Sequence, residues 1–196
     1  MSGMTTRDRI LDTALVAFGS RGYEATSLDA LAVELGVRKQ TILYWFASKE
    51  ALLDAVVERA GIELAGVLEA ALASAKGVDR IEAVLKSVFG YSVRRPELLG
   101  LLREVNRMGG EVSIELSHRL APLIERAVAS LGALMDAGII RRAHPRTTLA
   151  LLYTLAVGVA ADVEAHRGLG VGVDVAGLRR LRRELFGFVR AALSPS

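Results

Sequence analysis

Residues 25–46 read ATSLDALAVELGVRKQTILYWF, and they predict two short amphipathic helices separated by a glycine. The first helix begins with Thr26 and Asp29, which have the three-residue spacing of a capping box. Apolar residues then recur at helical spacing as far as Leu35. Gly36 ends this helix, because glycine readily adopts the left-handed backbone conformation that closes a helix.

The second helix is predicted from about Arg38 to Phe46, and its two faces differ in chemistry. Val37, Ile42 and Phe46 fall on the side that packs against the preceding helices. The outward face is mostly polar or charged, and it holds Arg38, Lys39, Gln40, Thr41, Leu43 and Tyr44. With a supporting helix predicted over residues 6–20, the layout is that of a helix-turn-helix, whose second helix lies in the major groove of DNA.

The outward face has the side chains that read base edges. Arg38 and Lys39 can donate hydrogen bonds to guanine, and Gln40 can pair with adenine. Thr41 and Leu43 can contact the methyl groups of thymine. The sequence therefore predicts direct contact between this helix and double-stranded DNA.

Phosphate contacts are predicted on either side of the base-reading residues. Tyr44 carries a hydroxyl suited to a phosphate oxygen. Lys49 lies in the first turn of the next helix, where the helix dipole disfavours a positive charge. A bound anion would offset this unfavourable interaction. A phosphate would meet both Lys49 and the backbone N–H groups near Ser48. The same argument places Thr26 and Ser27 against a second phosphate.

Three consecutive aromatic residues, Tyr44, Trp45 and Phe46, stand out in a chain that is only 5% aromatic. We expect Phe46 to lie in the core, Tyr44 to face the DNA backbone and Trp45 to lie at the rim. The alternative is that the aromatic residues only fill the core of a small three-helix unit, and that the neighbouring basic residues are solvated surface charges.

Composition and charge narrow the class of protein. The 196 residues are enough for a core without cross-links, and the absence of Cys excludes disulfides and thiolate metal sites. The net charge is +3, but residues 1–48 carry five basic and five acidic side chains, so DNA affinity there depends on charge placement. No signal peptide is read, and the apolar run at 147–161 is shorter than the roughly 20 residues of a membrane span. We expect a cytoplasmic protein without a membrane segment.

Helical periodicity extends along the whole chain and predicts an all-α fold of about nine helices. After residue 48 the predicted helices cover residues 49–75, 78–91, 96–109, 111–137, 145–167 and 174–193. We expect a helix-turn-helix DNA-binding domain over residues 1–48 and a second helical domain over residues 49–196. The glycine-rich segment 168–177 is expected to be a connector, because it follows a helix and lacks the spacing of a dinucleotide-binding loop.

The stretch RILDTALVAFGSRGYEATSLDALAVELGVRKQTILYWFASKEALL, residues 9–53, closely resembles the N-terminal signature of the TetR family of bacterial transcriptional regulators. Beyond it, only the order and lengths of the helices agree. The resemblance implies a homodimeric DNA-binding repressor whose operator affinity is changed by a small molecule bound in the C-terminal domain. One position departs from the family pattern: Leu43 replaces a common Tyr, so an apolar contact with a methyl group or sugar is expected there.

Two C-terminal helices are predicted to form the subunit interface. The helix over 147–161 is apolar on every side, and the last helix has an apolar stripe opposite a run of arginines. They resemble the helix pair that dimerises TetR-family proteins, so we expect a homodimer through residues 146–167 and 174–193. Two recognition helices then enter successive major grooves of a near-palindromic operator. The arginine run is interpreted as a solvated face, with membrane or RNA binding as the alternative.

The resemblance implies an effector pocket among the helices predicted between residues 78 and 167. Their apolar stripes carry few polar residues, which favours a largely apolar small-molecule effector. The candidate ligand-binding residues are Phe89, Leu102, Asn106, Ser117, His118 and Tyr153.

No metal site, cofactor or catalytic group is predicted. The three histidines lie far apart in the sequence, and no set of nucleophile, base and orienting residue is visible. We therefore expect a regulator that is not an enzyme. The rival hypothesis is a helical carrier or enzyme for apolar molecules whose N-terminal unit has lost its affinity for DNA.

Overall fold

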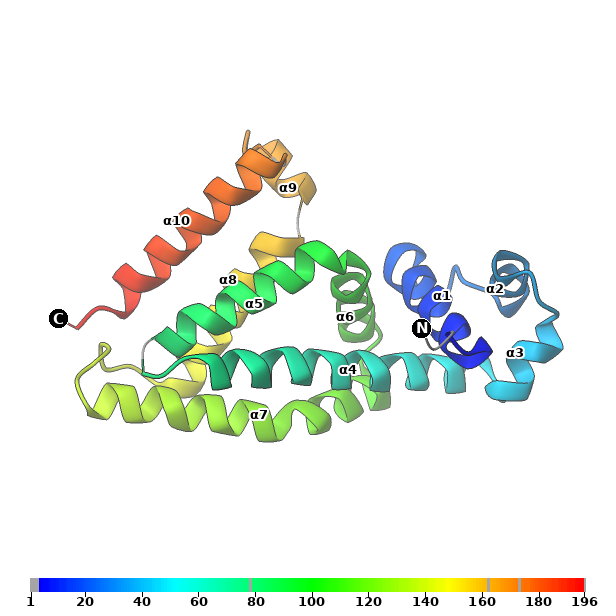
Figure 1. Ribbon diagram of the computed structural model, residues 1–196, viewed down its shortest axis with the longest axis horizontal. Coiled ribbons are helices and arrows are strands. Elements are labelled where there is room, and N and C mark those ends of the chain that lie inside the picture. Colours follow the sequence, from blue (N-terminus) through cyan, green and yellow to red (C-terminus); the bar gives the residue numbers. More distant parts are fainter. Residues whose placement is uncertain (1–3, 78, 162, 173, 196) are drawn as a thin grey trace. The chain divides into compact units, whose positions relative to one another are not determined.

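The computed structural model describes residues 4–77, 79–161, 163–172 and 174–195, and all regular structure within them is helical (Figure 1). The side chains at positions 92, 111–113, 115–117, 119, 157, 159–161 and 163–165 lie outside this description. The predicted all-α fold is confirmed. Within the described ranges, no helix is long and apolar enough to cross a membrane.

Ten helices are found in the described residues. They are α1 (Thr6–Arg21), α2 (Leu28–Leu35), α3 (Lys39–Trp45), α4 (Lys49–Ser74), α5 (Asp79–Arg94), α6 (Pro96–Met108), α7 (Gly110–Asp136), α8 (Pro145–Ala161), α9 (Val163–Gly168) and α10 (Val175–Leu193). The prediction of about nine helices differs by one. The segment predicted as a single helix over residues 145–167 is described as α8 and α9, on either side of residue 162, which is not itself described.

The chain divides into two compact units, each of which is built from segments that are separate in the sequence. The first unit comprises Met1–Leu64 and Arg95–Arg119, and the second comprises Ala65–Arg94 and Leu120–Ser196. α6 therefore belongs to the same compact unit as the N-terminal helices.

The core of the first unit is formed by α1, α2, α3, the beginning of α4 and α6 (Figure 1). Phe18 of α1, Ile42 of α3 and Val105 of α6 are completely buried in it. Each of these side chains lies on the apolar stripe of its helix, so burial of the stripes brings the helices together. The core of the three N-terminal helices therefore also includes side chains of α6, a helix that begins only at Pro96.

α1 and α6 pack backbone against backbone where Gly19 faces Gly100. A Cβ atom on Gly100 would lie 1.9 Å from the carbonyl oxygen of Gly19, and one on Gly19 would lie 2.2 Å from the carbonyl oxygen of Glu97. These distances are far below van der Waals contact, so no larger residue fits at either position unless the helices separate. The two glycines therefore permit the close approach of α6 to α1.

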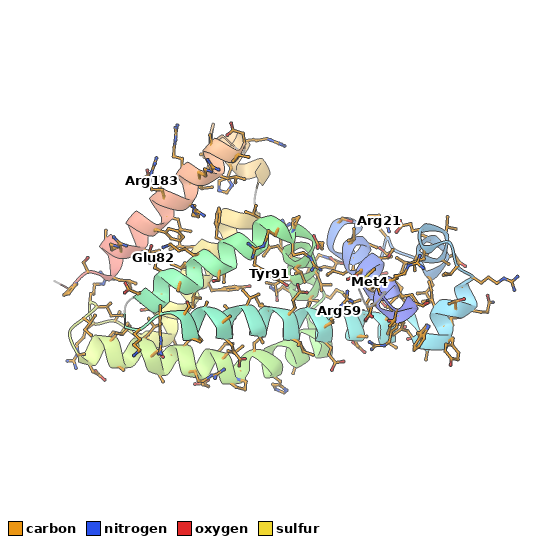
Figure 2. All side chains as sticks on the ribbon, in the orientation of Figure 1. Met4, Arg21, Arg59, Glu82, Tyr91 and Arg183 are labelled. Carbon is orange, nitrogen blue, oxygen red and sulfur yellow. The ribbon has the colours of Figure 1, made fainter. Side chains whose placement is uncertain are left out.

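Two ion pairs tie α1 to its neighbours in the first unit (Figure 2). Arg21, in the last turn of α1, pairs with Glu34 of α2. Arg59 of α4 pairs with Asp12 of α1. Both pairs are partly exposed, so they contribute little to stability and mainly favour one register of the packed helices.

The second unit has a separate core to which α5, α7, α8 and α10 contribute. Its buried members include Phe89 of α5, Leu152 of α8 and Leu185 of α10. Arg190 of α10 donates to Glu82 of α5 at 2.7 Å, which links the two helices at the surface of this unit (Figure 2).

Candidate nucleic-acid interface

Gly36 forms the turn between α2 and α3, with φ 67° and ψ 33°. This is the left-handed conformation that the sequence predicts for a helix-closing glycine. The N–H of Val37 donates to the carbonyl oxygen of Ala32 at 3.0 Å, and Arg9 of α1 donates to the carbonyl oxygen of Leu35 at 3.1 Å. Because these bonds occupy carbonyl groups at the end of α2, the turn is held and sets the direction of α3.

α3 divides its side chains between the core and the solvent as its sequence pattern predicts. Ile42 is completely buried, and Phe46, which caps the helix, is also in the core. The residues predicted to contact DNA are exposed or half-buried, and they are Arg38, Lys39, Gln40, Thr41, Leu43 and Tyr44. The outward side of α3 is therefore the predicted polar face, although contact with DNA stays a prediction.

The three consecutive aromatic residues lie in different environments. Phe46 is buried, Tyr44 is 81% exposed and Trp45 is 43% exposed. The rings of Tyr44 and Trp45 meet edge to face with their centroids 5.3 Å apart. The guanidinium of Arg7 lies 5.4 Å from the centroid of Phe46, so α1 covers the end of α3. The exposed Tyr44 hydroxyl stands where a partner can reach it.

Lys39 is engaged in an ion pair at the start of α3. Its ammonium lies 2.8 Å from a carboxylate oxygen of Asp29, in the first turn of α2. An exposed pair of this kind contributes at most about 1 kcal/mol. Lys39 can therefore exchange the carboxylate for a phosphate or a base edge at small cost.

Two helix N-termini flank α3 in the sequence, and each begins with a serine. The Oγ of Ser27 accepts a hydrogen bond from the N–H of Ala30 at 3.1 Å, and the Oγ of Ser48 accepts one from the N–H of Ala51 at 3.1 Å. The first N–H groups of an α-helix have no acceptor within the helix. The N-termini of α2 and α4 are therefore suited to anions such as phosphate.

Thr26 does not occupy its predicted place. It is 2% exposed, and its hydroxyl donates to the carbonyl oxygen of Gly22 at 2.8 Å. The predicted capping box between Thr26 and Asp29 is wrong, because Ser27 is the residue that caps α2. A buried hydroxyl that is engaged with the backbone is not presented to a phosphate. Ser27 therefore remains the candidate at this helix end, and Thr26 does not.

Tyr23, which the sequence pattern did not single out, lies next to the start of α4. The ammonium of Lys49 lies 4.0 Å from the centroid of the Tyr23 ring. The Tyr23 hydroxyl donates to Glu50 at 2.9 Å, and the Tyr23 N–H donates to Glu104 of α6 at 2.7 Å. Burial, followed by the hydrogen bond to Glu50, raises the pKa of Tyr23 to about 12. Tyr23 is therefore neutral at physiological pH.

Glu104 is a second residue that sequence reasoning missed. Arg107 donates to its carboxylate from Nε at 2.9 Å and from Nη2 at 2.8 Å. These bonds, together with the bond from the N–H of Tyr23, lower the pKa of Glu104 to about 2. No local signal could have paired Tyr23 with a residue 81 positions away.

The lowered pKa of Glu104 predicts how stability depends on pH. The charged form is favoured in the folded state, so its contribution is present above the ordinary pKa of 4.5 and is lost as pH falls toward about 2. Glu104→Gln should lower the free energy of unfolding by about 1 to 2 kcal/mol at pH 7. The difference from the wild type should shrink as pH falls from about 5 to 2, which urea titrations at several pH values would measure.

Glu125→Gln is the matched control for this pH experiment, because Glu125 is an exposed carboxylate of α7 whose partner is Arg146. Its effect at pH 7 should stay within about 0.5 kcal/mol. A Glu104→Gln deficit that stayed constant down to pH 2 would contradict the linkage to Glu104 ionisation.

The six candidate ligand-binding residues are not brought together within either unit. Phe89 is buried in the core of the second unit, whereas Tyr153 in the same unit is 49% exposed. Leu102 is half-buried on α6 of the first unit, and Asn106 is exposed. The remaining two were predicted on α7, where His118 is exposed and the side chain of Ser117 lies outside the described residues. Their role in ligand binding stays a prediction.

Side chains that could bind a metal are dispersed over the part of the chain that the structure describes. Within that part, no three His, Cys, Asp or Glu side chains are grouped so that they could hold a metal ion. The expectation that the protein needs no metal stays a prediction.

The N-terminal helices and the chain as a whole are similar to known transcriptional regulators. Residues 10–56 match the family model of bacterial regulatory proteins of the tetR family. The chain is also 26% identical over 177 residues to the HTH-type transcriptional repressor SCO4008 of Streptomyces coelicolor, a match that covers 90% of this chain and 89% of that protein.

The fold of the whole chain is similarly shared with solved structures. The ketosteroid transcriptional regulator KstR2 of Mycobacterium tuberculosis has a TM-score of 0.81 and 14% identity, over 100% of this chain and 98% of that one. AibR, solved in complex with isovaleryl coenzyme A and operator DNA, has a TM-score of 0.79 and 18% identity, over 97% of this chain and 99% of that one.

The helix-turn-helix with its exposed polar face and these matches define a DNA-binding transcriptional regulator. Its N-terminal segment, residues 10–56, has the helix-turn-helix of the tetR family of bacterial regulatory proteins.

Proposed function

We propose that the protein acts in the cytoplasm as a homodimeric repressor, which binds a near-palindromic operator and is released by a mainly hydrophobic small molecule. The observation that supports this most is the exposed polar face of α3, which the sequence places between the N-termini of α2 and α4. A helix that reads bases, accompanied by helix ends that favour phosphates, is the arrangement that a helix-turn-helix needs. In this proposal residues 1–48 bind DNA and residues 49–196 bind the effector and the second subunit.

The proposal gives different roles to the residues of the interface. Arg38, Lys39 and Gln40, at the start of α3, face base edges in the major groove. Thr41 and Leu43 make apolar contacts with thymine methyl groups or sugars. The phosphate contacts come from Ser27, Tyr44 and Lys49.

These roles predict different behaviour for Lys49→Ala and Gln40→Ala. Lys49→Ala should weaken binding to all DNA sequences alike, because a phosphate contact carries no sequence information. Gln40→Ala should also relax the preference at one base pair, by about 1 to 3 kcal/mol. Fluorescence anisotropy with an operator fragment and its single-base variants measures both effects.

Arg126→Gln is the control for the loss of one positive charge, since Arg126 is an exposed residue of α7 in the second unit and pairs with Glu69. It should leave both affinity and base preference close to those of the wild type. Identical binding profiles for Lys49→Ala and Gln40→Ala would refute the assignment of roles.

Exposed apolar residues on α8 and α10 support a dimer. Leu151 of α8 is 61% exposed and Phe188 of α10 is 63% exposed. Large apolar side chains on two helices of one unit, outside its core, are typical of a subunit interface. Arg183 projects from α10 away from α5, which agrees with a solvated arginine face (Figure 2).

An effector is supported by the composition of the second unit and by its structural relatives. The core of this unit consists of apolar side chains such as Phe89, Met135 and Leu152. A similar fold has been solved with both isovaleryl coenzyme A and operator DNA. That neighbour supports binding of a small-molecule effector, and the apolar core of the second unit supports a largely apolar one for this chain. We infer that this effector changes operator affinity about 5- to 150-fold, for a coupling of roughly 1 to 3 kcal/mol.

Salt-dependent DNA binding decides between this function and a carrier or enzyme for apolar molecules. A fragment selected from the source genome and a random duplex are each titrated with protein at several salt concentrations, with fluorescence anisotropy as the measurement. The repressor should bind the selected fragment more tightly, with a steep negative slope of log affinity against log salt. Equally weak binding of both duplexes at every salt concentration would favour the carrier or enzyme.

A further inference from the structure

Tyr23 is the meeting point of three helices in the first unit. It is 7% exposed, and its ring lies 5.5 Å from the ring of Phe18 in α1, centroid to centroid. Lys49 and Glu50 of α4 contact the ring face and the hydroxyl, at 4.0 Å and 2.9 Å. A single buried side chain therefore contacts both of the first two residues of α4.

Glu104 of α6 fixes the backbone at Tyr23 through a hydrogen bond. Its Oε1 accepts the Tyr23 N–H at 2.7 Å, and Arg107 binds the same carboxylate with two further hydrogen bonds. The preceding residue, Gly22, has φ 88°, and a Cβ there would lie 3.3 Å from the Glu104 carboxylate. Glycine therefore allows the chain to bend closely around this carboxylate.

The same turn leads directly into the N-terminus of α2. The N–H of Thr26 donates to the carbonyl oxygen of Tyr23 at 3.1 Å, and the Thr26 hydroxyl donates to the carbonyl oxygen of Gly22 at 2.8 Å. Ser27, the cap of α2, follows immediately. The position of Ser27 thus depends on the turn that Glu104 holds.

We propose that Tyr23, held by Glu104 of α6, is a positioning residue for the groups that contact phosphate at the N-termini of α2 and α4. The inference rests on the proposed function, because it assumes that Ser27 and Lys49 meet DNA. Neither Tyr23 nor Glu104 touches DNA itself. They act through the two groups that do.

The physical reason is pre-organisation. A lysine side chain loses rotamer freedom when it binds a phosphate, and this loss reduces affinity. The Tyr23 ring attracts the Lys49 ammonium to one place before DNA arrives, while ammonium N–H donors remain for a phosphate. The Tyr23 hydroxyl donates a hydrogen bond to the neighbouring Glu50 carboxylate. Without that bond the carboxylate would compete with a DNA phosphate for the Lys49 ammonium. Removing the ring or its backbone support should therefore weaken the contribution of Lys49.

The test is a double-mutant cycle on full-length protein with a fluorescein-labelled random duplex of about 30 base pairs, since phosphate contacts need no particular sequence. The single variants are Lys49→Ala, Tyr23→Leu and Glu104→Gln, and each of the last two is also combined with Lys49→Ala. Affinity is measured by anisotropy between about 50 and 200 mM salt. Glu125→Gln, alone and with Lys49→Ala, controls for the loss of a negative charge at an exposed site.

Adding Lys49→Ala to the wild type, or to the Glu125→Gln control, should weaken binding to the duplex about tenfold. This is the loss expected for one charge-assisted hydrogen bond. The slope of log affinity against log salt should become shallower by about 0.9 for each phosphate that the protein no longer neutralises. In Tyr23→Leu the same substitution should weaken binding less than about twofold, because the ring that attracts Lys49 is gone. In Glu104→Gln it should weaken binding by an intermediate amount, about three- to fivefold, because the neutral amide accepts the Tyr23 N–H less strongly and loses the charge-assisted bonds from Arg107. Tyr23→Phe keeps the ring, so the effect of Lys49→Ala should largely return.

Equal effects of Lys49→Ala in all backgrounds, with circular dichroism showing folded protein, would overturn the positioning role and leave the proposed function intact. If the Tyr23→Leu variant did not fold, the proposal would be tested with Glu104→Gln and Tyr23→Phe, because both variants keep an aromatic ring at position 23. If the wild type bound the duplex without any dependence on salt, the proposed function would fail, and the positioning role would fail with it.

Discussion

Replacement of Gly100 by valine should strongly destabilise the first unit. A Cβ at this position would lie 1.9 Å from the carbonyl oxygen of Gly19 and 2.7 Å from its carbonyl carbon. Both atoms belong to the backbone of α1, so no side-chain rotation relieves the clash. Overpacking in a core usually costs about 1 to 3 kcal/mol, and a clash with backbone should reach or exceed the upper end. Stability of most domains is only about 5 to 15 kcal/mol, so a large part would be lost.

Thermal unfolding followed by circular dichroism measures this loss, with Gly66→Ala as the control. Gly66 lies within α4, and no neighbouring atom lies within 4 Å of the position that an alanine methyl group would take. Alanine should therefore stabilise the helix by about 1 kcal/mol. The two substitutions should shift the melting temperature in opposite directions. A Gly100→Val variant as stable as the wild type would mean that α6 does not approach α1 as closely as described.

The double substitution Leu151→Glu with Phe188→Glu should convert the proposed dimer into monomers. Both side chains are largely exposed in the single chain, so the folded subunit tolerates the carboxylates. In a two-fold symmetric interface each new charge occurs twice and loses water on association. A cost of about 3 kcal/mol raises the dimer dissociation constant more than 100-fold. Operator affinity should fall as the dimer dissociates, because a monomer reaches only one half-site.

Sedimentation velocity at micromolar protein concentration measures the change in oligomeric state, and anisotropy measures the change in DNA binding. Arg183→Glu is the control, since it introduces a carboxylate on the arginine face of α10. It should remain a dimer. If the double variant sedimented as the wild type does, the interface would not lie on the exposed apolar residues of α8 and α10.

The N-terminal helices could be predicted well from the sequence because their signals are local. The stripe of α1, the glycine between α2 and α3 and the two faces of α3 each depend on residues three or four positions apart. Ile42 and Phe46 are buried, and Tyr44 is exposed, as those spacings require. The cap of α2 was misplaced by one residue, because Thr26 and Ser27 both have a suitable hydroxyl. The bond from Thr26 to Gly22 leaves the cap to Ser27.

The candidate ligand residues could not be placed by the same method. Helical spacing indicates which side of a helix is apolar, but it does not say which neighbour covers that side. Phe89 is buried in one unit, whereas Asn106 is an exposed residue of the other. Assigning a pocket needs the packing of several helices at once, and that information is spread over the whole chain.

The amino-acid pattern alone was sufficient for the helix-turn-helix, its outward chemistry and the family, since each rests on short-range periodicity and on a motif within the first sixty residues. Long-range packing was needed to show that α6 joins the N-terminal helices, that Gly100 meets Gly19, and that Glu104 holds Tyr23 from 81 positions away. Contacts between distant segments form only when the chain buries its apolar surface as a whole, so no local spacing encodes them.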